Sequence, residues 1–586
     1  MRAGAKLCST KENPINLTSS KNVFWGWLGL LALCGFTFFL GLGGLPLTGP
    51  DEPRYAEIGR EMFASGDWIT PRLNGYLWLE KPIWLYWGQA ISYHLFGVNE
   101  FAARFPSALS ALVTVLFVAF AVGKLVSRRW GILAGAVLAT SAFWFALARA
   151  ASTDMGLACA IAVAVLAGHL GINAQGRART GYWLLFALAL GVSMLAKGLV
   201  GILLICLITG VHRLLMKQPI GRSMRRNSAL LWGGILVFAL TVASWYVPVT
   251  MINGMTFIDE FFVNHHFKRF FENEFHHLQP PYFYLLVVLA ELLPWPFFLA
   301  GGLARLKRLG ARDDARGDLL LLAWVWAIVP IAFFSVSKSK LPSYILPSLP
   351  PLAIIIGWEL ERIWRGEVDI WGVIGVGFTS LIAAIVGIGF AVYVFQDGVS
   401  IAGWGFLGLV LPPLLGLGAL VAFLLKKREL AMSATMTLTA SIALAAVVLL
   451  FGHLGPKMSK AQLATQAFQA LKQGESIVYY RKVKEYAPVF YARGRVLYYQ
   501  QVNDADKQPI AGRSTLLPPG TLSTGDEVDA LTPDELMLAI NQSPTHAVVV
   551  ITEEAGAVEL ASEARFHTEL IRKQGKVMAL RVELIG

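Results

Sequence analysis

Long apolar stretches recur along this chain and restrict its fold more than any other feature. They begin near residue 23, return as far as residue 454, and carry few charged residues. A helix of about 20 residues spans the ~30 Å hydrocarbon core of a bilayer. Only 15% of the 586 residues are charged, against roughly 25% in soluble domains. Collagen, a disordered chain and a set of soluble domains are therefore excluded, and the sequence predicts a polytopic α-helical membrane protein.

About thirteen of these stretches are candidates for membrane-spanning helices. They lie near residues 23–46, 104–125, 131–148, 152–172, 180–195, 197–216, 229–251, 282–303, 318–336, 342–361, 370–395, 403–425 and 434–454. The first is longer than the core of a signal peptide and lacks a small-residue cleavage site, so we expect a retained anchor. Residues 82–97 are also apolar, but reach only about 24 Å as a helix, so we expect them at the membrane interface.

Lysine and arginine residues gather in alternate loops between these stretches. The basic segments are 2–21, 124–129, 177–179, 213–226, 305–316, 362–365 and 426–428. Basic loops stay in the cytoplasm, so the net charge of +12 reflects membrane topology, and nucleic acid is not an expected partner. An odd number of crossings then places residues 457–586 outside the cytoplasm.

The sequence divides into two parts at residue 456. Residues 1–456 form the expected transmembrane part, with outside loops at 47–103 and 252–281. In 457–586, short β-type runs alternate with helical patterns, which predicts a small α/β domain. The expected strands are 476–480, 495–499 and 546–551, the expected helices 460–471 and 533–540, and the expected loop 504–529. This part contains no cysteine, so it must fold without disulfides.

The first outside loop contains a dense group of ionisable residues beginning at Asp51 and Glu52. Pro53 suits the first turn of a helix, in which Arg54 and Tyr55 follow. This amphipathic helix is expected to lie on the membrane surface. Glu52 is the expected capping position, with Asp51 just before it. Two interpretations remain open here, because Asp51 and Glu52 either only cap the helix or belong to a functional site.

Other charged groups lie near the outside ends of apolar stretches. Asp154 enters one of them, at a cost of about 2.5–3.5 kcal/mol that makes it a functional-site candidate. Lys197 lies at another boundary, where its ammonium either serves a site or reaches the lipid headgroups. Glu80 and Lys81 are neighbours that, taken alone, also fit a surface ion pair. Lys340 and Tyr344 flank the start of the stretch at 342–361.

The loop after the seventh apolar stretch is rich in histidine. Between residues 264 and 277 it contains His265, His266, His276 and His277, together with Lys268, Arg269 and two glutamates. The histidine spacing fits neither a zinc finger nor a helical metal motif. The loop therefore either binds a metal or directs its cations at lipid phosphate.

Several of these segments resemble the bacterial aminoarabinose transferases of the C-type glycosyltransferase superfamily. The resemblance rests on Asp51-Glu-Pro-Arg-Tyr-Ala-Glu57, Leu79-Glu-Lys-Pro82, Ser152-Thr-Asp154, Lys197-Gly198, His265-His-Phe-Lys-Arg269 and Lys340-Leu-Pro-Ser-Tyr-Ile-Leu-Pro347. It extends over the whole chain and implies a C-type glycosyltransferase fold in the inner membrane, with a periplasmic C-terminal α/β domain.

The resemblance also implies an activity and a site. The activity is transfer of 4-amino-4-deoxy-L-arabinose from undecaprenyl phosphate to a lipid A phosphate, which lowers the charge of lipopolysaccharide and confers polymyxin resistance. Asp51 and Asp154 would be catalytic, and Lys81 and Arg269 would bind the donor phosphate. The remaining implied residues are Arg54, Tyr55, Lys197, Lys340 and Tyr344 in the pocket, and Glu80 and His265 as ligands of a divalent metal, zinc.

Two alternatives remain at the level of the sequence. A protein O-mannosyltransferase-like enzyme shares the superfamily motifs, and for its hydroxyl acceptor Asp51 would have to be a general base. A lipid flippase or secondary transporter is compatible with many spans and intramembrane charges. The ionisable groups cluster on the outside face instead of the midplane, which argues against transport.

Overall fold

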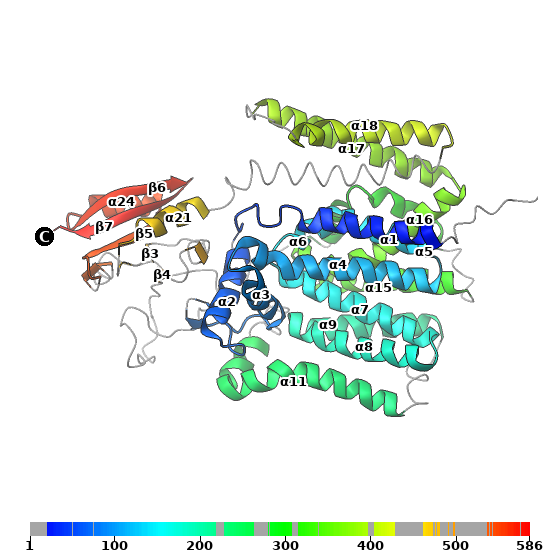
Figure 1. Cartoon of the computed structure of the whole chain (residues 1–586), viewed down its shortest axis with the longest axis horizontal. Helices are drawn as coiled ribbons and strands as arrows, with labels where there is room; N and C mark the ends of the chain where they lie inside the picture. The colour runs from blue at the N-terminus through cyan, green and yellow to red at the C-terminus, as the bar shows by residue number, and fades with distance from the viewer. Residues whose placement is uncertain are drawn as a thin grey trace, which may run out of the picture.

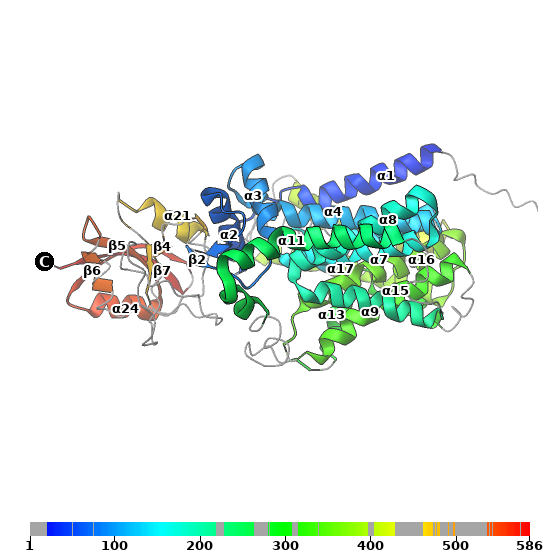
Figure 2. The ribbon, with the colours of Figure 1, turned by 90° about the horizontal axis from the view of Figure 1, so that it is seen from below.

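The structure is a computed structural model. It describes residues 20–49, 51–73, 75–217, 228–262, 279–280, 282–306, 314–337, 339–396, 404–427 and 461–472, and parts of 475–585. A bundle of roughly parallel and antiparallel helices forms its largest part (Figure 1). The helices α2 and α3 lie between this bundle and a small sheet domain near the C-terminus (Figures 1 and 2).

Most expected spans correspond to helices in the bundle. The long helices are α4 (Glu100–Leu125), α7 (Thr153–Asn173), α8 (Gly176–Lys197), α9 (Leu199–Leu215), α11 (Ser228–Ile258), α15 (Ala315–Val336), α16 (Leu349–Arg365), α17 (Ile370–Gln396) and α18 (Trp404–Leu424). Within the described residues, six helices are long and apolar enough to cross a membrane, or up to eight if two bent pairs are included. The chain is thus a multi-pass membrane protein, while the number thirteen stays a prediction.

Two further expected spans each include a short helix that is not α-helical. The first consists of α1 (Ser20–Cys34) and a short π-helix, η1 (Gly35–Phe39). The 3-10 helix η5 (Pro342–Ser348) leads directly into α16. The expected span at 434–454 lies outside the described residues.

Two expected spans are broken into pairs of helices. Between α5 (Arg128–Thr140) and α6 (Ala142–Ala148) the chain bends by 68°, and between α13 (Phe283–Glu291) and the pair η3 (Pro296–Phe298) and α14 (Leu299–Ala304) by 113°. Ser141 is extended at the first break, and prolines lie in and beside the second. The breaks pair with each other, because the Ala142 amide donates to the Leu293 carbonyl at 2.9 Å. One freed amide of the first break and one carbonyl of the second are therefore satisfied inside the protein.

Helix α5 lies very close to α4 on one side and α16 on the other. A Cβ added at Gly131 would lie 2.2 Å from the Ala119 carbonyl oxygen of α4. One added at Gly357 of α16 would lie 2.7 Å from the Ala134 amide nitrogen of α5. Small residues allow this approach, and van der Waals packing is the main attraction between helices in lipid.

Helices α2 (Asp51–Ser65) and α3 (Trp84–Phe96) pack against each other at one end of the bundle. A small hairpin, β1 (Arg72–Leu73) with β2 (Tyr76–Leu77), joins them. Ile58 and Tyr86 are fully buried in their shared core. The 13 residues of α3 are too few to span a bilayer, in keeping with the interfacial position expected for 82–97.

The C-terminal part forms a five-stranded mixed sheet in the order β4-β3-β5-β7-β6. Its strands are β3 (Ile477–Tyr479), β4 (Val496–Leu497), β5 (Ala547–Glu553), β6 (Phe566–Gln574) and β7 (Val577–Leu584). Helices α21 (Ala461–Gln469) and α24 (Glu554–Ser562) belong to separate cores built on alternate residues of β5. The α/β prediction is confirmed. The sequence pattern missed β6, whose side chains are mostly exposed or half-buried, and its partner β7.

Candidate active site

The candidate site begins at the first turn of α2. Asp51 forms an ion pair with Arg54, and its side chain is 62% exposed, whereas that of Arg54 is 12% exposed. The Arg54 guanidinium lies 5.4 Å from the ring centroid of Tyr55 and 5.0 Å from that of Trp78. The two rings pack against the cation, which in turn pairs with the exposed Asp51 carboxylate.

Tyr55 marks the point where several predicted site residues come together. Burial raises the pKa of its phenol far above the usual range, and the nearby charges of Asp51, Glu80 and Asp154 raise it further, while Arg54 opposes them. These carboxylates come from three separate stretches of sequence. The structure thus brings Asp51, Glu80 and Asp154 close to a single phenol, which stays protonated and able to donate a hydrogen bond.

Asp154, at the start of α7, forms an ion pair with Lys197, the last residue of α8. The Lys197 ammonium also lies 5.1 Å from the ring centroid of Tyr344 in η5. Ser152 caps α7 by accepting a hydrogen bond from the Asp154 amide at 3.1 Å. A small pocket beside this turn is lined by Trp84, Ser107 and Ser152, among others. The predicted residues Asp154, Lys197 and Tyr344 therefore form one cluster.

The other predicted pocket residues take different positions. Lys340 is buried and donates a hydrogen bond to the Ser337 carbonyl at 2.7 Å. Glu80 and Lys81 are half-buried in the connection that leads to α3. Arg269 and His265 lie outside the described residues. The donor-phosphate pair and the zinc site of Glu80 and His265 therefore stay predictions.

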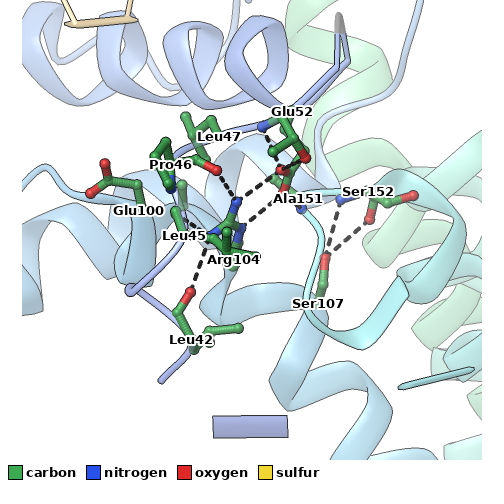
Figure 3. A network of polar contacts seen from close by, with 12 residues as sticks. Leu42, Leu45, Pro46, Leu47, Glu52, Glu100, Arg104, Ser107, Ala151 and Ser152 are labelled. Carbon is green, nitrogen blue, oxygen red and sulfur yellow. Dashed lines mark hydrogen bonds and ion pairs between the residues drawn. The ribbon is translucent and has the colours of Figure 1, made fainter. Parts of the chain in front are cut away.

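A buried ion pair behind Asp51 was not predicted from the sequence. Glu52, the next residue in α2, accepts two hydrogen bonds of 2.9 Å from the guanidinium of Arg104 in α4 (Figure 3). Arg104 also donates to the carbonyls of Leu42, Leu45 and Pro46. An arginine at the start of the apolar stretch 104–125 is costly in a membrane, and that signal could have found it.

Glu52 connects this pair to the turn that holds Asp154. Its carboxylate accepts hydrogen bonds from the backbone amides of Thr48 and Ala151, each at 2.9 Å. Burial alone would raise the pKa of Glu52. The Arg104 charge and these hydrogen bonds outweigh burial and hold the pKa below its ordinary value of 4.5. The charged carboxylate thus ties the loop before α2 to the turn before α7 (Figure 3).

Known proteins resemble this chain in sequence. The family model of dolichyl-phosphate-mannose-protein mannosyltransferases matches residues 80–246. An undecaprenyl phosphate-alpha-4-amino-4-deoxy-L-arabinose arabinosyl transferase of Enterobacter sp. (strain 638) is 34% identical, over 56% of this chain and 58% of its own length. The same enzyme of Aeromonas salmonicida (strain A449) is 33% identical, over 64% of this chain and 70% of its own length. The chain belongs to this family of arabinosyl transferases.

Membership rests on most, not all, of the relatives' length. The chain spans 58% of the Enterobacter protein and 59% of the one from Serratia proteamaculans (strain 568). The matched part of the mannosyltransferase model begins at Glu80 and ends within α11. It therefore includes Lys81, Asp154 and Lys197.

Solved structures extend the likeness to the whole fold. The crystal structure of ArnT from Cupriavidus metallidurans bound to undecaprenyl phosphate is 25% identical, with a TM-score of 0.75, and covers 95% of this chain and 98% of its own. An oligosaccharyltransferase of Archaeoglobus fulgidus is 12% identical, with a TM-score of 0.51, over 82% of this chain and 64% of its own. This second likeness shows the fold alone. The chain has the C-type glycosyltransferase fold of the arabinosyl transferases.

Proposed function

We propose that this protein transfers 4-amino-4-deoxy-L-arabinose from undecaprenyl phosphate to a phosphate of lipid A, at the periplasmic face of the bacterial inner membrane. The observation that carries the proposal is the geometry at one end of the bundle, where Glu52 joins the start of α2, with Asp51, to the turn before Asp154. It lies on a chain whose relatives are named for this donor. Lipopolysaccharide that contains the modified lipid A carries less negative charge, which accounts for the expected polymyxin resistance.

The chemistry requires one bond to break and one to form. The bond between the sugar's anomeric carbon and the donor phosphate oxygen breaks, and its electron pair leaves with undecaprenyl phosphate. A lipid A phosphate oxygen forms the new bond to the same carbon. Because the acceptor is already ionised near neutral pH, no strong base is required. Cations that neutralise the leaving phosphate matter more than a general acid.

Each residue of the candidate site has its own role in this reaction. Asp51, exposed beside the Arg54 stack, orients the acceptor or balances the ammonium of the amino sugar. Asp154, held by Lys197 and the Ser152 cap, provides a second carboxylate for the same purpose. Lys81 and Arg269 hold the donor phosphate. The phenol of Tyr55, protonated and buried, lines the pocket.

Purified protein with undecaprenyl-phosphate-linked aminoarabinose distinguishes the candidate functions. With lipid A as acceptor, mass spectrometry should detect the added aminopentose, and a serine- and threonine-containing peptide should stay unmodified. The match to the mannosyltransferase model favours a second candidate, a protein O-mannosyltransferase-like enzyme. Transfer to the peptide alone would establish that candidate. Movement of the lipid without any transfer would establish a flippase.

The orientation in the membrane has its own test. The basic segment 426–428 precedes one further expected span, so residues 457–586 should be periplasmic. A reporter that is active only in the periplasm should be active when fused to the C-terminus. Activity of a cytoplasmic reporter at that position would instead place the sheet domain on the cytoplasmic side.

The proposed phosphate clamp is tested with single substitutions. Each charge-assisted hydrogen bond contributes about 1.5–3 kcal/mol, which is roughly 10- to 150-fold in rate. Lys81→Ala and Arg269→Ala should lower turnover as well as donor affinity, because charge builds on the leaving phosphate. Arg269→Lys should keep part of the activity but lose the bidentate contact.

The alternative is that both cations only anchor the protein at anionic headgroups, where each contributes about 1 kcal/mol. Kinetics in detergent with a short-chain donor remove the bilayer surface and so separate the two cases. Lys124→Ala, in the last turn of α4, is the matched control. Normal turnover of both Lys81→Ala and Arg269→Ala in detergent would show that the clamp does not exist.

A further inference from the structure

Two histidines and one aspartate from three different helices meet inside the bundle. His169 lies near the end of α7, His212 near the end of α9, and Asp318 near the start of α15. Their ligand atoms all lie within 4.8 Å of one another, and no other such group of three occurs among the described residues. Both histidines are almost fully buried, with 5% and 3% of their surface exposed.

This cluster is separate from the proposed transfer site. His169 lies 15 residues beyond Asp154 along α7, which is about 22 Å at 1.5 Å per residue. The two clusters therefore occupy opposite ends of the same helix. Buried ionisable groups in a membrane bundle are costly, and they are functional candidates by default. The transfer chemistry uses none of these three residues.

The geometry has a simpler interpretation, a hydrogen bond between one histidine and the aspartate. His212 Nε2 and Asp318 Oδ1 are 2.8 Å apart, which fits such a bond. His169 Nε2 is 3.7 Å from Asp318 Oδ2, too far for one. A hydrogen bond therefore accounts for His212 but not for the second imidazole, which directs the same ring nitrogen at the other oxygen of the same carboxylate.

A bound metal ion accounts for both imidazoles. Ligands about 2.0–2.2 Å from a tetrahedral zinc ion lie roughly 3.3–3.5 Å from one another. The two nitrogen–oxygen distances, 2.8 and 3.7 Å, lie on either side of that value. Two imidazoles with one carboxylate suit zinc better than magnesium or calcium, which prefer oxygen ligands.

We propose that His169, His212 and Asp318 bind a zinc ion that fastens the ends of α7, α9 and α15 to one another. Three protein ligands leave a fourth position for water. Helix α9 packs against both α7 and α15, so one ion can join all three without rearrangement of the backbone. Because the site lies about 22 Å from Asp154 along α7, its proposed role is to join the three helices, and sugar transfer does not pass through it.

Zinc titration of the full chain in detergent, after chelator treatment, tests the proposal. The background is Glu80→Gln with His265→Ala, which removes the other predicted zinc ligands. In this background we expect one zinc ion per chain. His169→Ala, His212→Ala and Asp318→Asn should each weaken zinc binding by at least about 100-fold, because even residues behind the ligands contribute 10–100-fold. His94→Ala, an exposed histidine on α3, should bind zinc normally.

A second measurement covers the case in which a variant fails to fold. With the ligands intact, the same background should melt at least about 2 °C higher with zinc than with magnesium. Cobalt in place of zinc should give the intense visible absorption of a four-coordinate ion. Zinc binding that persists in all three variants would overturn the proposal, and so would the absence of both the melting shift and the cobalt absorption. Transfer activity is scored separately, so neither result bears on the proposed reaction.

Discussion

Asp51 and Glu52 are neighbours in sequence, yet they belong to two different regions of the molecule. The Asp51 side chain is 62% exposed and its partner Arg54 lies on the same helix, whereas that of Glu52 is 9% exposed and its partner Arg104 lies on another helix. The outer region, Asp51 with Arg54, leaves a charge accessible to a ligand. The inner region, Glu52 with Arg104, uses charge to hold loops together. The first turn of α2 therefore holds one accessible carboxylate and one buried carboxylate, and burial distinguishes their roles.

The largest effect should come from breaking the inner region. Arg104→Ala leaves Glu52 buried without its cation, and the loss of one member of a buried pair costs about 3–5 kcal/mol. We expect a marked drop in melting temperature in detergent. Arg104→Lys keeps the charge but loses the fork that reaches Glu52 and the carbonyls around Leu45, so it should be intermediate. A melting temperature in Arg104→Ala no lower than in Arg54→Ala would contradict the assignment of Arg104 to the scaffold.

The outer region should show the opposite pattern, a loss of activity without a loss of stability. Asp51→Asn removes the charge but retains an equally good helix cap. We expect transfer to lipid A to fall by about 100-fold, because a substrate that is no longer held in position reacts about that much more slowly, while the melting temperature stays unchanged. Mass spectrometry of lipid A from cells expressing the variant measures the first, and detergent melting the second. Near-normal lipid A modification would favour a capping role for Asp51.

Sequence reasoning identified the charged residues of the candidate site more readily than the ion pair of the inner region. Asp154 and Lys197 stand out because charged residues are rare in apolar stretches, and the structure brings them together. The pairing of Glu52 with Arg104 joins residues 52 positions apart, and no local pattern encodes such a distance. Glu52 follows Asp51 directly, so a helical pattern assigns both to the first turn without showing which is covered by another helix.

The helix breaks show the same limit. Hydropathy predicted single spans at 131–148 and 282–303, because each stretch is long and apolar enough. The breaks are stabilised by contacts between the two stretches, such as the hydrogen bond from Ala142 to Leu293 and that from Trp295 to Thr140. Neither stretch carries this information alone, although the prolines near residue 294 indicate where a helix can be interrupted.

Acid should affect the inner region in a predictable direction. The folded pKa of Glu52 lies below its ordinary value of 4.5, so the unfolded chain takes up the proton first as pH falls. The stability from this carboxylate is complete above that value and decreases as pH falls through the folded pKa. We expect the melting temperature to fall below pH 4.5, and to fall less steeply in Glu52→Gln. Equal slopes in the two proteins would argue against a charged Glu52.

The smallest effect is expected at the edge of the inner region. The Leu47 amide donates to the Tyr491 hydroxyl at 2.9 Å, and that hydroxyl donates to Glu100 at 3.0 Å. Tyr491→Phe removes both bonds and should cost about 1–1.5 kcal/mol. Limited proteolysis should then release the C-terminal part sooner, with activity retained. An unchanged digestion rate would indicate that the buried ring of neighbouring Phe490 holds this part alone.

The bond between Leu47 and Tyr491 also has a consequence for biogenesis. Its partners are 444 residues apart, and a ribosome adds roughly 5–20 residues per second. The Leu47 amide is therefore made about 20–90 s before the hydroxyl that it finally binds. Throughout that interval the loop beside Arg104 lacks this hydrogen bond, whichever helices have already been inserted into the membrane. A chain that stalls before residue 491 therefore never forms the hydrogen bond between Leu47 and Tyr491.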